Sequence, residues 1–159
     1  MEISFNDNDF IVSKTDTKGV ITYCNDTFIK MSGYREDELI GRPHNILRHA
    51  DMPACVFKLL WNTISAGDEI FAYVKNKTKQ GDFYWVFANV TPSYDTNGKL
   101  VGYYSVRRKP DISAIETIKQ IYADLLRVER LHGINASIKA FEELLAKKGG
   151  HYAKFILSI

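Results

Sequence analysis

The sequence lacks the features that mark secreted proteins and membrane spans. It has only two cysteines, Cys24 and Cys55, and their spacing fits neither a CxxC pair nor a disulfide framework. No segment approaches the roughly 18 consecutive apolar residues of a membrane-spanning helix. The acidic start MEISFNDNDF has neither the positive charge nor the apolar run of a signal peptide. We therefore expect reduced thiols in a cytoplasmic protein that does not insert into a membrane directly.

Neither sign of charge predominates in the sequence, and the signatures of common enzymes are absent. The 159 residues contain 21 Lys and Arg against 19 Asp and Glu, and the two signs are balanced on both sides of Pro110. Such a chain builds no one-sided basic face, so we expect no nucleic-acid partner. The sequence carries no nucleophile elbow, phosphate-binding loop, kinase signature or metalloprotease signature, so we expect no enzymatic activity and no catalytic residues.

What the sequence contains is a set of short β runs around a block of helical segments. The β runs are residues 10–15, 20–24, 69–77, 83–93 and 99–107. Gly19 provides the positive φ of the first hairpin, and KQGD and DTNG are the turns between the last three runs. Residues 53–66 repeat their apolar positions every four residues and predict an amphipathic helix. This order predicts an α+β fold, an antiparallel sheet with short helices on one face.

After Pro110 the pattern becomes helical. Ser113-Ala-Ile-Glu116 reads as a capping box for a helix that reaches about Leu131, and a second helix covers about 134–147. We expect residues 9–110 to form one domain and residues 111–159 a C-terminal helical extension. The apolar faces of these helices would cover the open side of the sheet, form a homodimer or contact a partner. The last nine residues, HYAKFILSI, would be a docking peptide or a frayed end.

The stretch RPHNILRHADMP, residues 42–53, places two imidazoles, two guanidinium groups, an amide and a carboxylate between two apolar segments. These residue types suit a metal, a phosphate, a catalytic base or an ordinary loop. In the ordinary loop, Asp51 would cap the helix that begins near Pro53. His44 and His49 have no third ligand at useful spacing, so we expect no metal site.

The order of these elements resembles that of a PAS sensory domain over about residues 9–110. The resemblance rests on SGYREDELIGRP and on the spacing from GVITYCNDTF to NKTKQGDFYWV. PHNILRHADMP, followed by LLWNTISAG and VKNKTKQGDFYWVFANVTP, is similar to the PAS domain of the bacterial aerotaxis receptor and its energy-taxis relatives. The resemblance implies a five-stranded antiparallel sheet that holds FAD non-covalently and reports its redox state.

The resemblance also implies which residues bind the flavin. They are Asn25, His44, Asn45, Arg48, His49, Asp51, Trp61 and Asn76. For such a ligand, Arg48 would offer a two-point fork to the diphosphate, His49 would add a donor, and Asp51 would orient them. The side-chain amide of Asn76 would pair with the carbonyl and imide edge of the ring.

A flavin ring is apolar on both faces and needs a hollow that covers them. We expect a concavity of the sheet lined by Val74, Trp85, Phe87 and Tyr104 and closed by the helix that carries Trp61. A haem bound through one histidine and a PAS module without a cofactor are the alternatives. A light sensor fits less well, because neither cysteine lies in an NCRFLQ-like stretch.

The chain ends at Ile159 without a membrane anchor or a long coiled coil. We therefore expect a stand-alone cytoplasmic sensor of redox or energy state. Its partner would be a separate, membrane-bound transducer of the methyl-accepting type, and the sensor would act on it in trans.

Overall fold

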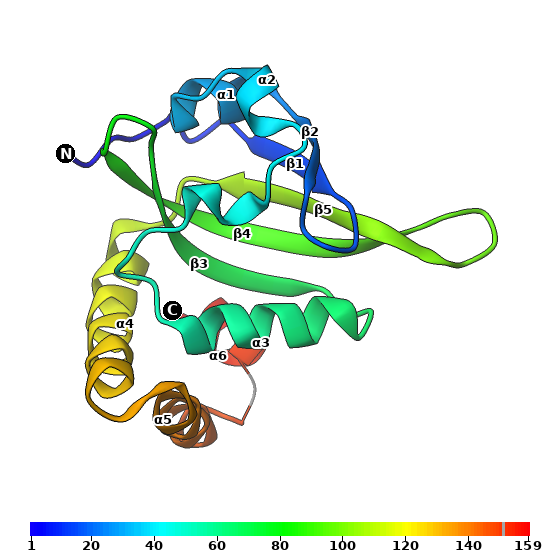
Figure 1. Ribbon diagram of the computed structural model, residues 1–159. Coiled ribbons are helices and arrows are strands. Elements are labelled where there is room, and N and C mark those ends of the chain that lie inside the picture. The colour runs from blue at the N-terminus through cyan, green and yellow to red at the C-terminus, as the bar shows by residue number, and fades with distance from the viewer. Residues whose placement is uncertain (151) are drawn as a thin grey trace.

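The structure, a computed structural model, describes residues 1–150 and 152–159 and contains a five-stranded antiparallel sheet (Figure 1). The strands are β1 (Ile11–Thr15), β2 (Ile21–Cys24), β3 (Ile70–Lys77), β4 (Phe83–Tyr94) and β5 (Leu100–Arg108). Their order across the sheet is β2-β1-β5-β4-β3, and every neighbouring pair is antiparallel. The α+β fold expected from the hairpin signals is confirmed.

The helices before β3 pack on one face of the sheet, and the C-terminal helices pack against β3 and part of the opposite face. The helices are α1 (Asp26–Ser32), α2 (Glu36–Leu39), the 3₁₀-helix η1 (His44–Leu47), α3 (Ala54–Ser65), α4 (Ile112–His132), α5 (Ile134–Lys147) and α6 (Tyr152–Ser158). Figure 1 shows α1 and α2 near β1 and β2, while α3 runs beside β3 and α4 and α5 lie beyond it. None of the helices in the described ranges has both the length and the apolar character needed to cross a membrane.

Alternation along the strands divides the sheet into an inner and an outer face. On β5, the side chains of Tyr103, Ser105 and Arg107 share the inner face, which α1 and α3 cover. Tyr104 and Arg108 lie between them in sequence and therefore point outward, where both are exposed. The inner face is thus where enclosed polar groups can meet a ligand.

The turn between β1 and β2 comes close to α3. Gly19 has a φ of 83°, as the expected hairpin requires. A Cβ atom on Gly19 would lie 2.9 Å from the indole ring of Trp61. Glycine is needed here twice, once for the backbone conformation and once for the close approach of the Trp61 ring.

The C-terminal helices share the hydrophobic core with α3 and β3. Tyr122 on α4 donates a hydrogen bond of 2.7 Å to the Tyr73 carbonyl oxygen of β3, and its ring lies 6.1 Å from that of Trp85. Phe155 and Ile156 of α6 are buried in the same cluster. Residues 152–158 are therefore a packed helix rather than a frayed end, and His151 lies outside the described residues. Of the three roles expected for the C-terminal extension, the structure shows that of covering the sheet, on its β3 side.

Glu129 of α4 caps helix α3 from a distant part of the chain. Its carboxylate accepts hydrogen bonds from the backbone N–H groups of Ala54 at 2.8 Å and Cys55 at 3.1 Å. The Ser137 hydroxyl of α5 donates to the same carboxylate at 2.8 Å. Burial opposes the ionisation of Glu129, but these hydrogen bonds outweigh it and hold its pKa below the ordinary value. One carboxylate therefore joins α3, α4 and α5.

Two caps expected from the sequence do not form. Asp51 does not cap α3, because its carboxylate lies 2.8 Å from the Lys75 ammonium group and the α3 cap position is Pro53. Helix α4 begins at Ile112 with Asp111 before it, so Ser113 already lies inside the helix and cannot cap it.

Replacement of Glu129 by alanine should lower the free energy of unfolding by about 1–3 kcal/mol, because two donors in the first turn of α3 lose their acceptor. Urea unfolding at pH 7 measures the change. The matched control is Glu143→Ala on the exposed face of α5, where a change within about 0.5 kcal/mol is expected. Equal effects of the two substitutions would show that Glu129 does not cap α3.

Candidate functional site

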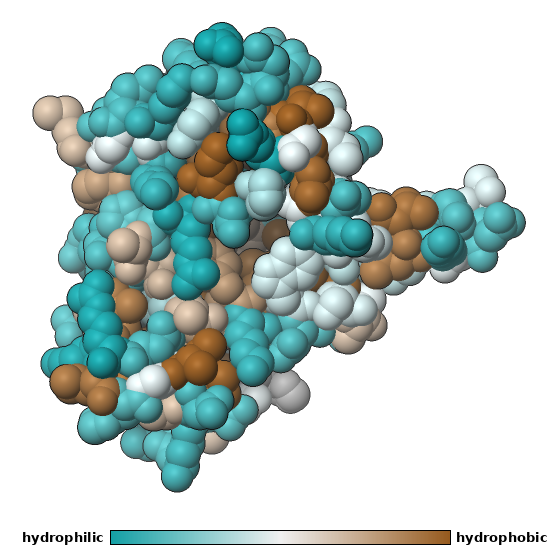
Figure 2. All heavy atoms as spheres, in the orientation of Figure 1, coloured by the Kyte–Doolittle hydropathy of each residue, from teal (hydrophilic) through white to brown (hydrophobic). Residues whose placement is uncertain are grey.

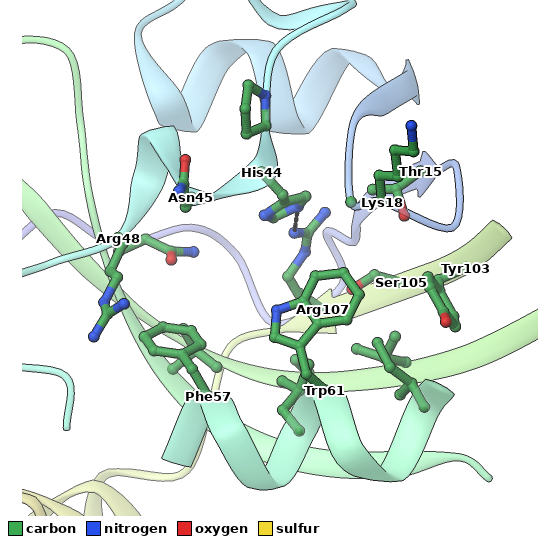
Figure 3. Close-up of a pocket in the computed structure, with 18 of the residues that line it drawn as sticks. Thr15, Lys18, His44, Asn45, Arg48, Phe57, Trp61, Tyr103, Ser105 and Arg107 are labelled. Carbon is green, nitrogen blue, oxygen red and sulfur yellow. Dashed lines mark hydrogen bonds between the residues drawn. The ribbon is translucent and has the colours of Figure 1, made fainter. Parts of the chain in front are cut away.

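A cavity of about 460 Å³ lies between α3 and the inner face of the sheet. Its volume is within the roughly 300–1,000 Å³ of small-molecule sites. Figure 2 shows the surface hollowed near the centre of this face, and Figure 3 shows the lining side chains. The apolar part of the lining comes from Phe57, Leu60, Trp61 and Ile64 of α3 and from Val74, Ala88, Val90 and Tyr103 of the sheet. The walls that α3 and the sheet contribute are therefore largely apolar.

A polar cluster lies at the inner end of the cavity. The Arg107 guanidinium donates through Nη1 to His44 Nε2 at 2.8 Å, the contact drawn as a dashed line in Figure 3. It also donates through Nη2 to the Ser13 hydroxyl at 2.6 Å. Arg107 is 3% exposed, and its guanidinium carbon lies 4.9 Å from the centre of the Phe28 ring. The strands β1 and β5 and the 3₁₀-helix η1 thus place three polar side chains together.

The charges in this cluster are fixed by its surroundings. Burial and the positive charge of Arg107 lower the pKa of His44 to about 3, so this imidazole is neutral at physiological pH. A guanidinium can only donate, so Nε2 of His44 accepts and the ring proton is on Nδ1. Burial lowers the pKa of Arg107 to about 10, which leaves it positively charged.

Arg107 has no anionic partner. Within the described ranges 1–150 and 152–159, no carboxylate lies at ion-pair distance from it, and its Nε–H group is buried without a hydrogen-bond acceptor. A buried charge without a partner is costly, and buried polar groups in proteins are normally paired. The cluster therefore presents an unused donor and a net positive charge.

The mouth of the cavity carries further cations. Lys18, Arg48 and Lys58 line it and are exposed. The guanidinium carbon of Arg48 lies 4.5 Å from the centre of the Phe57 ring, and Figure 3 shows this side chain at the edge of the site. No Asp or Glu belongs to the lining in the described part of the chain. The electrostatics of the whole cavity thus favour an anionic ligand.

Two expected ligand residues connect the mouth to the apolar walls. Asn76 of β3 is 5% exposed, and its backbone pairs with that of Arg48 in an isolated bridge. Trp61 is 38% exposed and packs edge-on against Tyr103 at 5.8 Å. Trp61 therefore stands at the opening, as the expected closing helix requires.

The cavity contains five of the eight residues that the resemblance implies bind the flavin, namely His44, Asn45, Arg48, Trp61 and Asn76. Asn25 lies elsewhere and has a structural role. Its side-chain oxygen accepts from the backbone N–H groups of Phe28 and Val12, and its amide donates to the Phe10 carbonyl. Asn25 therefore caps α1 and joins it to β1, and this structural role explains the residue without a ligand contact.

His49 and Asp51 also lie outside the cavity lining. His49 Nδ1 accepts a hydrogen bond of 3.0 Å from the backbone N–H of Asp51, and the His49 ring packs edge-on against Phe83. The Asp51 carboxylate accepts from the Lys75 ammonium group, which holds its pKa below the ordinary value. The side chains of these two residues hold the loop in place, as in the ordinary loop that was the alternative interpretation of this stretch.

The expectation that Trp85, Phe87 and Tyr104 line the hollow is wrong. Trp85 and Phe87 are on the outer face, where Trp85 packs on α4 and Phe87 stacks on Phe71. Tyr104 points outward as well, and the neighbouring Tyr103 takes its place in the cavity. Val74 is the one residue of that group that lines the cavity.

Sequence reasoning missed Arg107, which is the most enclosed charge of the site. One signal was present, because Arg107 falls at alternate positions with Tyr103 and Ser105 in the run YYSVR. Ser13 was missed too, since a serine in a short strand carries no distinguishing pattern. Lys18 and Lys58 read from the sequence as ordinary surface lysines.

Comparison with known proteins gives one family and several relatives. A family model described as the PAS fold matches residues 21–107. The aerotaxis receptor of Escherichia coli (strain K12) is 37% identical over 143 residues, which are 90% of this chain and 27% of the receptor. The nitrogen fixation regulatory protein of Klebsiella pneumoniae is 28% identical over 109 residues, which are 69% of this chain and 22% of that protein. The chain thus spans about a quarter of the length of these relatives.

Solved structures share the fold. A light-oxygen-voltage domain from work on a flavin analogue superposes with a TM-score of 0.61 at 20% identity, over 70% of this chain and 83% of that chain. The dark structure of the blue-light photoreceptor Aureochrome1 LOV gives a TM-score of 0.56 at 26% identity, over 76% of this chain and 83% of that chain.

The neutral state of His44 predicts a pH dependence of stability. The pKa of His44 in the folded state lies below its ordinary value of 6.5, so the contribution of this residue to stability is present above pH 6.5 and is lost as the pH falls toward 3. Unfolding free energies measured between pH 7 and 4.5 should fall less steeply for His44→Gln than for the wild type, by up to about 1.4 kcal/mol per pH unit. His49→Gln is the comparison: burial also lowers the pKa of His49, but by less than that of His44, so this substitution should flatten the slope by a smaller amount. Identical slopes for His44→Gln and the wild type would contradict the prediction.

Proposed function

The chain belongs to the PAS family, and on that premise we propose that it senses redox or energy state through FAD held in the cavity. One observation carries the proposal: five residues at aerotaxis-type positions, from η1, the loop after it, α3 and β3, converge on one hollow. They do so beside three further cations, Lys18, Lys58 and Arg107, and beside apolar walls, the donor set and surface that a flavin with its diphosphate would need.

The residues present fit such a group. Val74, Ala88 and Trp61 would cover the faces of the ring, and the Asn76 amide would pair with its polar edge. Arg48 and the other exposed cations of the mouth would hold the diphosphate, a task for which a guanidinium fork is suited. The unpaired Nε–H of Arg107 shows that the inner end has an unused donor. When bound, a flavin supplies a ring whose electron and proton content follows the redox state of its surroundings.

Haem bound through His44 is the weaker candidate. Nε2 of this imidazole already accepts a hydrogen bond from Arg107, and Nδ1 carries the proton. His49 lies outside the cavity, with its Nδ1 engaged by the backbone of Asp51. A haem ligand would require one of these contacts to break.

The signal would leave the cavity through α3. Phe57 and Trp61 of α3 line the cavity, and the first turn of the same helix is held by Glu129. Ser137 binds the same carboxylate, so a movement of α3 would reach α4 and α5. In keeping with the likeness to an aerotaxis receptor, we propose a separate membrane-bound chemotaxis transducer of the methyl-accepting type as the partner. A homodimer is the alternative use of the C-terminal helices.

Purified protein is expected to show flavin absorbance, with FAD released on denaturation. Asn76→Ala and Arg48→Ala should each weaken FAD binding about tenfold or more, because each removes a hydrogen-bonding group from the site. The matched controls are Asn89→Ala on the outer face of β4 and Arg35→Ala at an exposed site, which should bind FAD normally. Colourless protein from flavin-rich cells would refute the proposal, and a haem spectrum would support the alternative.

The output route can be tested by amide hydrogen exchange on the FAD-loaded protein. Reduction is expected to change exchange in the first turn of α3 and in the facing parts of α4 and α5. In Glu129→Ala the change in α3 should persist while that in α5 is lost, because the shared acceptor is gone. Glu143→Ala is the control. Equal redox responses of α5 in both variants would refute this route.

A further inference from the structure

Arg107 is a buried cation that the protein itself does not neutralise. Two of its nitrogen atoms bond to neutral partners, His44 and Ser13, and its Nε–H has no acceptor. The Phe28 ring covers one face of the guanidinium, which adds a weak attraction but no opposite charge. Burial of a charge in this way is unfavourable unless another group restores the balance.

Arg107 lines the cavity, so a ligand in the cavity is the group that can supply the compensating negative charge. We propose that Arg107 determines the charge preference of the site: the electron-rich end of the flavin ring lies against it, and the reduced, more negative ring binds more tightly than the oxidised ring. This inference rests on the proposed function and names the residue that makes the affinity depend on redox state.

The position of Arg107 separates the ring from the diphosphate. Arg107 is 3% exposed on the central strand β5, so a group that reaches it must enter the cavity fully. Lys18, Arg48 and Lys58 are exposed at the mouth, where a hydrated diphosphate can remain in contact with solvent. Two separate sets of cations therefore match the two negative parts of one ligand, the ring inside and the phosphates outside.

Because His44 is neutral, the preference for a negative ring depends on the charge of Arg107 alone. Because Nε2 of His44 accepts from Arg107, the imidazole holds the guanidinium in place without adding or removing charge. Ser13 orients a second nitrogen in the same way. Loss of the guanidinium charge should therefore remove the preference for a negative ring, while Arg107→Lys should retain part of it.

The experiment compares riboflavin, which has no phosphate, with FAD. Dissociation constants are measured for the oxidised and the anaerobically reduced forms of both ligands on flavin-free protein. In Arg107→Met the preference for the reduced form should fall about tenfold for riboflavin and FAD alike, as expected for the loss of a charge-assisted contact. For FAD this is a shift of the reduction potential to a lower value by about 59 mV for a one-electron couple or about 30 mV for a two-electron couple.

The matched control is Arg108→Met, which removes the neighbouring arginine of β5 on the outer face and should leave the preference unchanged. Thermal unfolding of flavin-free Arg107→Met should be no lower than that of the wild type, because an unneutralised buried charge is removed. If Arg107→Met fails to fold, Arg107→Lys provides the same comparison with a smaller expected effect.

Three results would overturn the inference. An unchanged preference in both Arg107 variants would show that Arg107 does not sense the ring. A loss for FAD but not for riboflavin would place the phosphates, not the ring, at Arg107. Failure of wild-type protein to bind either flavin would refute the proposed function as well, and so is distinguishable from the first two results.

Discussion

The hydrogen bonds between the first turn of α3 and Glu129 are the constraint on which the rest of the site depends. Helix α3 forms one wall of the cavity, and the cavity exists because this helix stands across the inner face of the sheet without filling it. No side chain within the first turn of α3 supplies a cap. The C-terminal helices therefore hold the wall in place, and they belong to the site as much as the sheet does.

This constraint gives the polar loop before α3 a divided role. His44, Asn45 and Arg48 turn toward the cavity, whereas His49 and Asp51 turn away and fix the loop to Phe83 and Lys75. The stretch thus contains residues that line the cavity and residues that fix the loop itself. A loop that directs some side chains into a cavity needs other polar groups to hold its own backbone, and here neighbouring residues divide these tasks.

Much of the fold followed from local patterns, because hairpin turns and a four-residue apolar repeat are signals carried by adjacent residues. It was harder to assign which strand residues point to the inner face of the sheet and which to the outer face. In FYWVFANV nearly every residue is apolar, so the alternation that separates inner from outer positions cannot be read, and Trp85 was placed on the wrong face. The same ambiguity exchanged Tyr103 and Tyr104 on β5.

Long-range contacts were beyond the sequence for a different reason. The Glu129 cap joins residues about 75 positions apart, and the Arg107 contacts bring Ser13 and His44 to the end of β5. Nothing in the local sequence around any of these residues specifies its partner. The aerotaxis-type resemblance supplied the residues of η1, α3 and β3, but the innermost charge emerged only once the strands were paired.

The two tryptophans divide the molecule in a way that has a practical consequence. Trp61 stands at the opening of the cavity, while Trp85 is enclosed between the outer face and α4. Their indole emission therefore arises from two distinct surroundings, one wetted and one dry. With either ring replaced by phenylalanine, the fluorescence of the remaining one becomes a separate optical probe, for ligand entry at Trp61 and for the seating of the C-terminal helices at Trp85.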